Sequence, residues 1–161
     1  MILVLDSSPL ITLSKINQLP LLHELAQETF LHPAVYEEVF TPDKTGLKPQ
    51  VVEQARWLVT RSVQNFSLVK QLTKRLGKGE AEAIVLAKEI PGSVVVIDDA
   101  LGRKTALEQG VPVVGLLGLF VHAKELRIIP GIHSLLLQIQ QAGFYLDTRL
   151  VDTLLKECGE G

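Results

Sequence analysis

A chain of 161 residues with 47% hydrophobic side chains is long enough for one domain with a substantial core, which we expect to span residues 1–161. The formal net charge of −2 excludes a protein that holds nucleic acid by bulk positive charge, but it allows a local basic patch or a metal ion. The single cysteine, Cys158, excludes an internal disulfide, and the apolar run Ile2–Leu5 is too short to span a membrane, so we expect a cytoplasmic protein.

Strand and helix patterns alternate along the chain. Aliphatic runs predict buried strands, and Ser8 followed by Pro9 predicts the N-cap and first residue of the first helix. In chain order we expect a strand at 2–5, helices at 9–16 and from 19, a strand from 29, a helix at 34–40, a loop at 41–49, a helix at 50–56, a strand at 57–63, helices from 68 and at 80–89, a strand from 94, a helix at 100–109, a strand from 111, a helix at 116–125 and two final helices within 131–143 and 146–158. The alternation predicts the α/β class, as a three-layer α/β/α sandwich with a central, mostly parallel sheet.

Acidic residues follow two of the predicted strands directly. The first strand ends at Asp6, and the strand from Val94 ends at Asp98 and Asp99. Both runs are apolar at every position, which is typical of parallel strands covered on both faces, and ligands bind at the carboxyl ends of such strands. Helix capping is the alternative role of these aspartates. A neutral cap would serve equally well, so two such junctions predict a site.

Two helices offer further carboxylates. Glu80 and Glu82 lie in the first turn of the helix at 80–89, but positions two apart on a helix differ by about 200°, so both cannot face one cleft. Glu80 is nearer the N-terminus, where the alternative role is an interaction with the helix dipole worth under about 1 kcal/mol. Glu37 and Glu38 lie about equally far from the apolar stripe of their helix, so periodicity does not choose between them.

Carboxylates gathered in this way favour a hard divalent cation, because Mg²⁺ is held by a few carboxylates together with water and phosphate oxygens. Such a cation can activate water and neutralise the charge of a phosphodiester. Basic side chains for a polyanion lie nearby in the sequence at Lys70, Lys74, Arg75, Lys78, Arg103 and Lys104. Lysines 70, 74 and 78 lie at helical spacing and predict either a stripe that tracks phosphates or a solvated helix face.

Six segments, in their order and spacing, resemble the PIN domain family, and most closely its PIN-like group of small prokaryotic proteins described as nucleic-acid-binding. The segments are LDSSPLITLSK, HPAVYEEV, LGKGEAEAIVLA, VVVIDDALGRKTA, VPVVGLLGLFVHAK and AGFYLD, which together extend over essentially the whole chain. The resemblance implies the fold of metal-dependent ribonucleases, including the toxins of toxin–antitoxin pairs.

The family's functional residues carry over to matching positions. Asp6 matches the first acidic residue, and Ser8 matches the small polar residue that follows it. Glu38 matches the second acid because Val39 follows it, although Glu37 could substitute, and Glu80 matches the third. Asp98 and Asp99 compete for the fourth. The resemblance favours Asp99, although Ile97 stands where the family has a hydroxyl residue.

The resemblance also implies Mg²⁺ or Mn²⁺ as cofactor, RNA as substrate, a small antitoxin protein as partner and a homodimer. The leading hypothesis is an endoribonuclease in which Asp6, Glu38, Glu80 and Asp99 bind one or two metal ions, with Lys74, Lys78, Arg103 and Lys104 contacting the nucleic acid. One alternative is a catalytically degenerate PIN domain that binds RNA or protein, and another is a Mg²⁺-dependent phosphatase or receiver domain. We further expect a dimer or antitoxin interface on the aliphatic side chains of the last two helices, or on the helix that contains residues 116–121. The side chains of the last two helices are Leu135, Leu136, Ile139, Leu150, Val151, Leu154 and Leu155.

Overall fold

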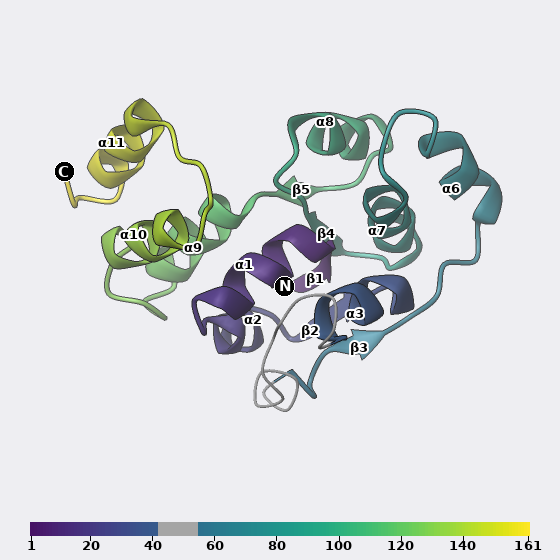
Figure 1. The fold of residues 1–161 in the computed structure, drawn as a ribbon, viewed down its shortest axis with the longest axis horizontal. Helices are drawn as coiled ribbons and strands as arrows, with labels where there is room; N and C mark the ends of the chain where they lie inside the picture. The colour runs from purple at the N-terminus through teal and green to yellow at the C-terminus, as the bar shows by residue number, and fades with distance from the viewer. Residues whose placement is uncertain (42–54) are drawn as a thin grey trace.

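Five short strands form one all-parallel sheet in the order β3-β2-β1-β4-β5 in the computed structural model, which describes residues 1–41 and 55–161 (Figure 1). The strands are β1 (Ile2–Leu5), β2 (Glu28–Leu31), β3 (Val59–Thr60), β4 (Ser93–Val96) and β5 (Val113–Val114). The central strand β1 pairs with β2 on one side and β4 on the other. Strands β2 and β3 follow β1 on one side, and β4 and β5 are added on the other side. The switch point of the sheet therefore lies between β1 and β4, where ligands bind in open α/β sheets.

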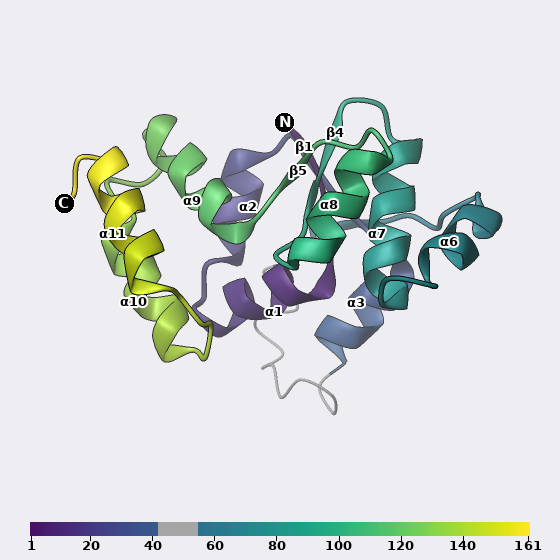
Figure 2. The same cartoon turned by 90° about the horizontal axis from the view of Figure 1, so that it is seen from above.

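Helices cover both faces of this sheet. In chain order they are α1 (Ser7–Lys15), α2 (Leu19–Leu25), α3 (Pro33–Phe40), α6 (Phe66–Leu72), α7 (Lys78–Glu89), α8 (Ala100–Glu108), α9 (Leu116–Glu125), α10 (His133–Gln141) and α11 (Thr148–Glu157). Residues of α6, α7 and α8 form one hydrophobic cluster with one face of the sheet, and residues of α1, α2, α3, α9 and α10 form a second cluster with the other face (Figure 2). The three-layer α/β/α sandwich is confirmed.

The two clusters explain why the first strand is apolar throughout. Leu3 and Leu5 belong to one cluster and Val4 to the other, and all three side chains are completely buried. Burial of each such side chain stabilises the fold by about 1.5–3 kcal/mol. Because strand side chains alternate between faces, a strand covered on both faces must be apolar at every position.

The C-terminal residues are held by one carboxylate. Glu160 accepts hydrogen bonds from the backbone N–H of Ile132 (3.0 Å) and of His133 (3.2 Å), at the start of α10. It also pairs with Lys124 of α9 at 2.9 Å, and Lys124 in turn donates to the carbonyl oxygen of Cys158. These donors, the Ile132 N–H first, lower the pKa of Glu160 to about 2. The end of the chain is therefore tied to both preceding helices.

The first helix and the third strand differ from the sequence-based expectation. The helix begins at Ser7 with Asp6 as its N-cap residue, not with Ser8 and Pro9, because Asp6 leaves the strand with extended backbone and the next residue is already helical. The strand expected at 57–63 is limited to β3, an edge strand paired through only two residues. Residues 42–54, which include most of the expected loop at 41–49 and helix at 50–56, lie outside the described residues.

The C-terminal helices were expected to offer an apolar interface, and this is wrong for α10. Leu135, Leu136 and Ile139 are buried in the chain's own core, because α10 packs on the same cluster as α9. Val151 and Leu154 of α11 also pack partly against that cluster. The sequence pattern predicted the apolar faces of these helices correctly, but it could not show that these faces pack against the chain's own core. Within residues 1–41 and 55–161, no helix has the length and apolar character needed to cross a bilayer.

Candidate metal and nucleic-acid site

Asp6 lies at the centre of a group of carboxylates at the carboxyl edge of the sheet. It follows β1 directly, and its backbone N–H approaches the Val96 carbonyl oxygen of β4 at 3.5 Å. The residue is only 6% exposed. Burial raises the pKa of Asp6, and the negative charges of Glu38 and Asp98 raise it further, against a lowering effect of the Ser7 backbone N–H and hydroxyl. Its carboxylate therefore shares one space with acids from α3 and from the end of β4.

The start of α7 brings a further acid to the same space. The first turn of α7 lies beside Asp6, because a Cβ at Gly79 would be 3.4 Å from the Asp6 carboxylate, an ordinary contact distance. Burial, then the charges of Asp99 and Asp6, raise the pKa of Glu80 to about 6. Its Oε2 atom is buried and has no hydrogen-bond donor. The helix-dipole role alone does not account for Glu80, because a dipole effect would lower the pKa.

Asp98 and Asp99 have different roles at the end of β4. Asp99 is exposed and caps α8, accepting a hydrogen bond from the Gly102 N–H at 2.8 Å, while its charge also acts on Glu80. Asp98 accepts a hydrogen bond from the Leu116 N–H at 2.8 Å through Oδ1, whereas its Oδ2 is buried and without a donor. Burial raises the pKa of Asp98. The family resemblance favours Asp99 as the fourth acid, whereas the buried oxygen without a donor belongs to Asp98.

The surroundings of Glu37 and Glu38 show which of the two lies near the acidic group. Glu38 acts electrostatically on Asp6 and lines a cavity with Ser7 and Ser8, whereas Glu37 lines a different cavity beside Leu58. The geometry therefore brings Glu38, and not Glu37, toward the acidic group. Ser8 lies on the same side, but the hydroxyl that affects Asp6 belongs to Ser7, which sequence reasoning missed.

A second buried carboxylate on α7, Glu82, contacts basic side chains. Glu82 is 2% exposed, and its Oε2 contacts the Nδ1 atom of His32, the N-cap residue of α3, while Lys78 Nζ lies 3.9 Å from its Oε1. The contact joins the helices that carry Glu38 and Glu80. Sequence reasoning missed His32, although a signal was present, because this residue follows β2 directly as a polar side chain at the carboxyl edge of the sheet.

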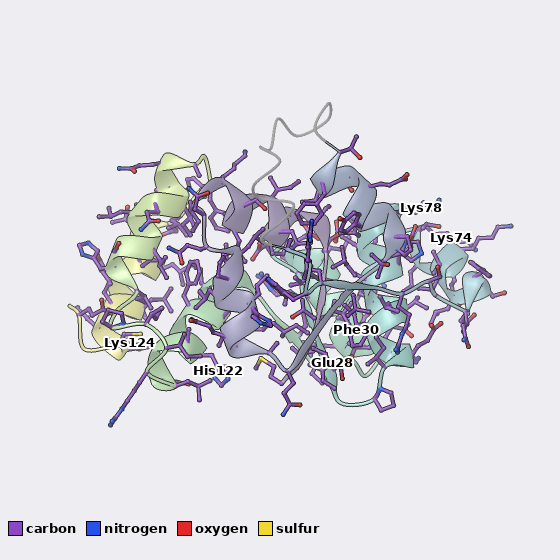
Figure 3. All side chains as sticks on the ribbon, turned by 90° about the horizontal axis from the view of Figure 1, so that it is seen from below. Glu28, Phe30, Lys74, Lys78, His122 and Lys124 are labelled. Carbon is purple, nitrogen blue, oxygen red and sulfur yellow. The ribbon has the colours of Figure 1, made fainter. Side chains whose placement is uncertain are left out.

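The basic side chains lie at two places. Arg103 is half-buried and donates to the Asp98 carbonyl oxygen at 2.5 Å, and Lys104 is exposed on the same helix. Lys74 and Lys78 are exposed at the α6–α7 end of the molecule (Figure 3). The expected continuous lysine stripe is not formed, because α6 ends at Leu72 and Lys74 lies in the following turn.

The donor set suits a hard divalent cation. It consists of carboxylate oxygens, two of them buried without donors, and the pKa of Asp6, Glu80 and Asp98 is raised in each case. In the described parts of the chain, no three His, Cys, Asp or Glu side chains converge closely enough to hold an ion as they stand. This spacing is compatible with Mg²⁺, which is usually held by one or two carboxylates and completed by water and phosphate oxygens.

Comparison with protein families gives one match. The profile of a family described as a PIN domain matches residues 2–160, which is nearly the full chain. No curated protein matches the sequence significantly. The match includes all the carboxylates described above and both layers of helices.

Proposed function

The chain belongs to the PIN domain family, and we propose that it is an endoribonuclease that depends on Mg²⁺ or Mn²⁺. PIN domains are generally nucleases that use divalent metal ions. The observation that carries the proposal is that two acids whose charges interact with the buried Asp6, Glu80 and Asp98, each have a buried carboxylate oxygen without a donor, Oε2 and Oδ2. Buried polar atoms without partners are costly, and a bound cation would compensate for that cost.

In this proposal Asp6, Glu80, Asp98 and Asp99 would hold the ion, one or two of them directly and the others through bound water, and Glu38 would orient the attacking water. A bound divalent cation supplies charge stabilisation at the phosphodiester and lowers the pKa of water. Asp99 keeps α8 capped while its charge contributes to the site, and the Leu116 N–H fixes the orientation of the Asp98 carboxylate. In the metal-free protein the pKa of Glu80 is raised to about 6, and a bound cation would favour its ionised form.

RNA is the proposed substrate, with Lys74, Lys78, Arg103 and Lys104 contacting its phosphates. Arg103 lies next to the carboxylates, since its guanidinium contacts the Asp98 carbonyl oxygen. A toxin role with a small antitoxin protein, a homodimeric assembly and a cytoplasmic location belong to the same proposal and are supported by the family resemblance. Light scattering of the purified chain, alone and with the product of a neighbouring short reading frame, tests the assembly.

The activity is tested with an end-labelled single-stranded RNA, incubated with the protein in Mn²⁺, in Mg²⁺ and in EDTA. We expect internal cleavage that EDTA abolishes, that an Asp6→Asn variant lacks and that a Glu37→Gln variant retains. A DNA oligonucleotide of the same sequence shows whether the activity requires ribose. Binding of the RNA without cleavage in either metal would contradict the proposal and identify the chain as a binding module.

A further inference from the structure

A cavity of about 380 Å³ opens beside the acidic edge and is not used by the proposed metal chemistry. Its walls come from the start of α8, the start of α9 and the segment between α10 and α11. They include Asp98, Arg103, Gly115, Leu117, Tyr145 and Leu150. The volume lies in the range of about 300–1,000 Å³ that small-molecule sites occupy. Asp98 belongs to both the cavity and the carboxylate group, so a ligand here lies next to the proposed metal site.

One end of the cavity is polar and carries the Arg103 guanidinium beside Asp98. The Arg103 guanidinium is held there by its hydrogen bond to the Asp98 carbonyl oxygen at 2.5 Å. A guanidinium has five N–H donors in a planar fork, which suits the oxygens of a phosphate. Gly115 keeps this end open, because a Cβ at that position would lie 3.4 Å from Arg103 Nη1 and 3.3 Å from Asp98 Oδ1.

The other end of the cavity is apolar and carries an exposed aromatic ring. Tyr145 is 86% exposed, the highest value among the large hydrophobic side chains of the described residues. Its neighbour Leu146 is buried in the core, so the backbone that carries the ring is anchored while the ring faces solvent. Leu117 and Leu150 line the adjoining wall. An exposed ring beside an apolar wall is a surface on which a planar base can stack.

We propose that this cavity binds one nucleotide of single-stranded RNA, with the base stacked on Tyr145 and its phosphate at Arg103. The inference rests on the proposed function and assigns a substrate contact to the segment AGFYLD, to which that function gives no role. A phosphate held at Arg103 would lie beside Asp98 and therefore next to the proposed metal site. Stacking accepts any base, so this subsite positions the strand and does not select a sequence.

The test measures binding and cleavage separately. Fluorescence anisotropy in EDTA gives the dissociation constant of a short fluorescein-labelled oligoadenylate for the wild type and for Tyr145→Ala, Tyr145→Phe and Phe66→Ala. Phe66 is a matched control, because it is also an exposed aromatic residue, 71% accessible, but starts α6 at the opposite end of the molecule from α11 (Figure 1). Cleavage of the same RNA in Mn²⁺ gives kcat and KM for each variant.

We expect Tyr145→Ala to weaken oligoadenylate binding by about 5- to 100-fold, the usual loss for one stacked base, and to raise KM while leaving kcat nearly unchanged. Tyr145→Phe and Phe66→Ala should bind as the wild type does. Arg103→Gln should reduce the salt dependence of binding by about one phosphate contact. Because Tyr145 is exposed, its removal leaves the core intact, and a thermal melt verifies this.

The outcomes separate the subsite from the nuclease activity. If Tyr145→Ala binds oligoadenylate as tightly as the wild type while the wild type cleaves RNA, the subsite is wrong and the nuclease proposal stands. If Tyr145→Ala loses affinity but the wild type cleaves nothing, the subsite stands and the nuclease proposal fails. A change of oligomeric state in Tyr145→Ala, seen by light scattering without a change in RNA affinity, would overturn the subsite and identify a second copy of the chain as the occupant.

Discussion

Two glutamates in this molecule lie in opposite electrostatic environments. Glu160 accepts hydrogen bonds from two backbone N–H groups and pairs with Lys124, and its pKa is lowered to about 2. Glu80 lies among other carboxylates with a buried oxygen that has no donor, and its pKa is raised to about 6. Glu80 lies in the first turn of α7, and Glu160 contacts the start of α10. Both are glutamates at a helix N-terminus, so residue type and local position do not account for the difference in pKa.

The difference shows how a structural carboxylate can be distinguished from a functional one. Glu160 is stabilised as an anion by the fold itself, because every donor it needs comes from α9 and α10. The fold leaves Glu80 and Asp98 with unpaired oxygens, which lowers the stability of the metal-free protein. A site of this kind gains stability when a cation binds, and perturbed carboxylates in a group are typical of functional sites.

The largest effect is expected for the acid at the centre of the group. Asp6→Asn keeps the shape of the side chain but removes its negative charge, which acts electrostatically with the charges of Glu80 and Glu38. We expect RNA cleavage to fall by at least about 100-fold, because a ligand charge is lost. Initial rates in Mn²⁺ measure this, with Glu160→Gln as the matched carboxylate control. Equal losses of activity in the two variants would erase the distinction between the two kinds of carboxylate.

Removal of the structural carboxylate should affect stability and not activity. Glu160→Ala leaves Lys124 and the N–H groups of Ile132 and His133 without their acceptor. We expect the free energy of unfolding to fall by about 1–3 kcal/mol, as for other lost acceptors of part-buried donors. Urea denaturation measures it, with Glu157→Ala, an exposed residue at the end of α11, as the control. A Glu160→Ala variant as stable as the control would show that the C-terminal contacts contribute nothing.

The two glutamates should also respond oppositely to pH. The pKa of Glu80 is raised from 4.5 to about 6, so its ionised form destabilises the fold fully above pH 6, and this cost is relieved as the pH falls toward 4.5. The stability advantage of Glu80→Gln over the wild type should therefore grow as the pH rises from 4.5 to 6 and reach about 1 kcal/mol after solvent screening. Urea denaturation in EDTA across this range tests the sign.

For Glu160 the sign is reversed. Its folded pKa of about 2 lies below the ordinary 4.5, so its stabilising contribution is present above pH 4.5 and is lost as the pH falls toward 2. The stability difference between the wild type and Glu160→Gln should therefore shrink over that range. A difference that stays constant with pH for either glutamate would contradict the environment assigned to it.

A third glutamate provides the smallest expected effect. Glu108 pairs with Arg75 at 3.2 Å, but both side chains are about half exposed and water can replace either partner. We expect Glu108→Gln to change the free energy of unfolding by less than about 0.5 kcal/mol, as for exposed ion pairs in general. Urea denaturation beside Glu160→Ala gives the comparison. A loss as large as that of Glu160→Ala would mean that backbone donors are not what makes Glu160 important.

The sequence allowed the position of the site to be predicted, because apolar runs identify strands covered on both faces and place Asp6 and the Asp98–Asp99 pair at one edge. It could not assign Asp98, because the donor that orients this carboxylate is the N–H of Leu116, which lies 18 positions further along the chain. The contact of His32 with Glu82 is hidden in the same way. Such contacts depend on tertiary packing, and the spacing of residues along the sequence does not reveal them.

The central claim, that the carboxylates at the sheet edge form a cation site, is tested most directly by thermal unfolding with and without Mn²⁺. We expect Glu80→Gln to melt at the same temperature as the metal-free wild type or higher, and to lose most of the Mn²⁺-dependent increase in Tm. Glu160→Gln, as the matched variant, should melt lower than the wild type and keep the full increase. A Glu80→Gln variant that is destabilised without metal, and that Mn²⁺ still stabilises as much as the wild type, would contradict the account.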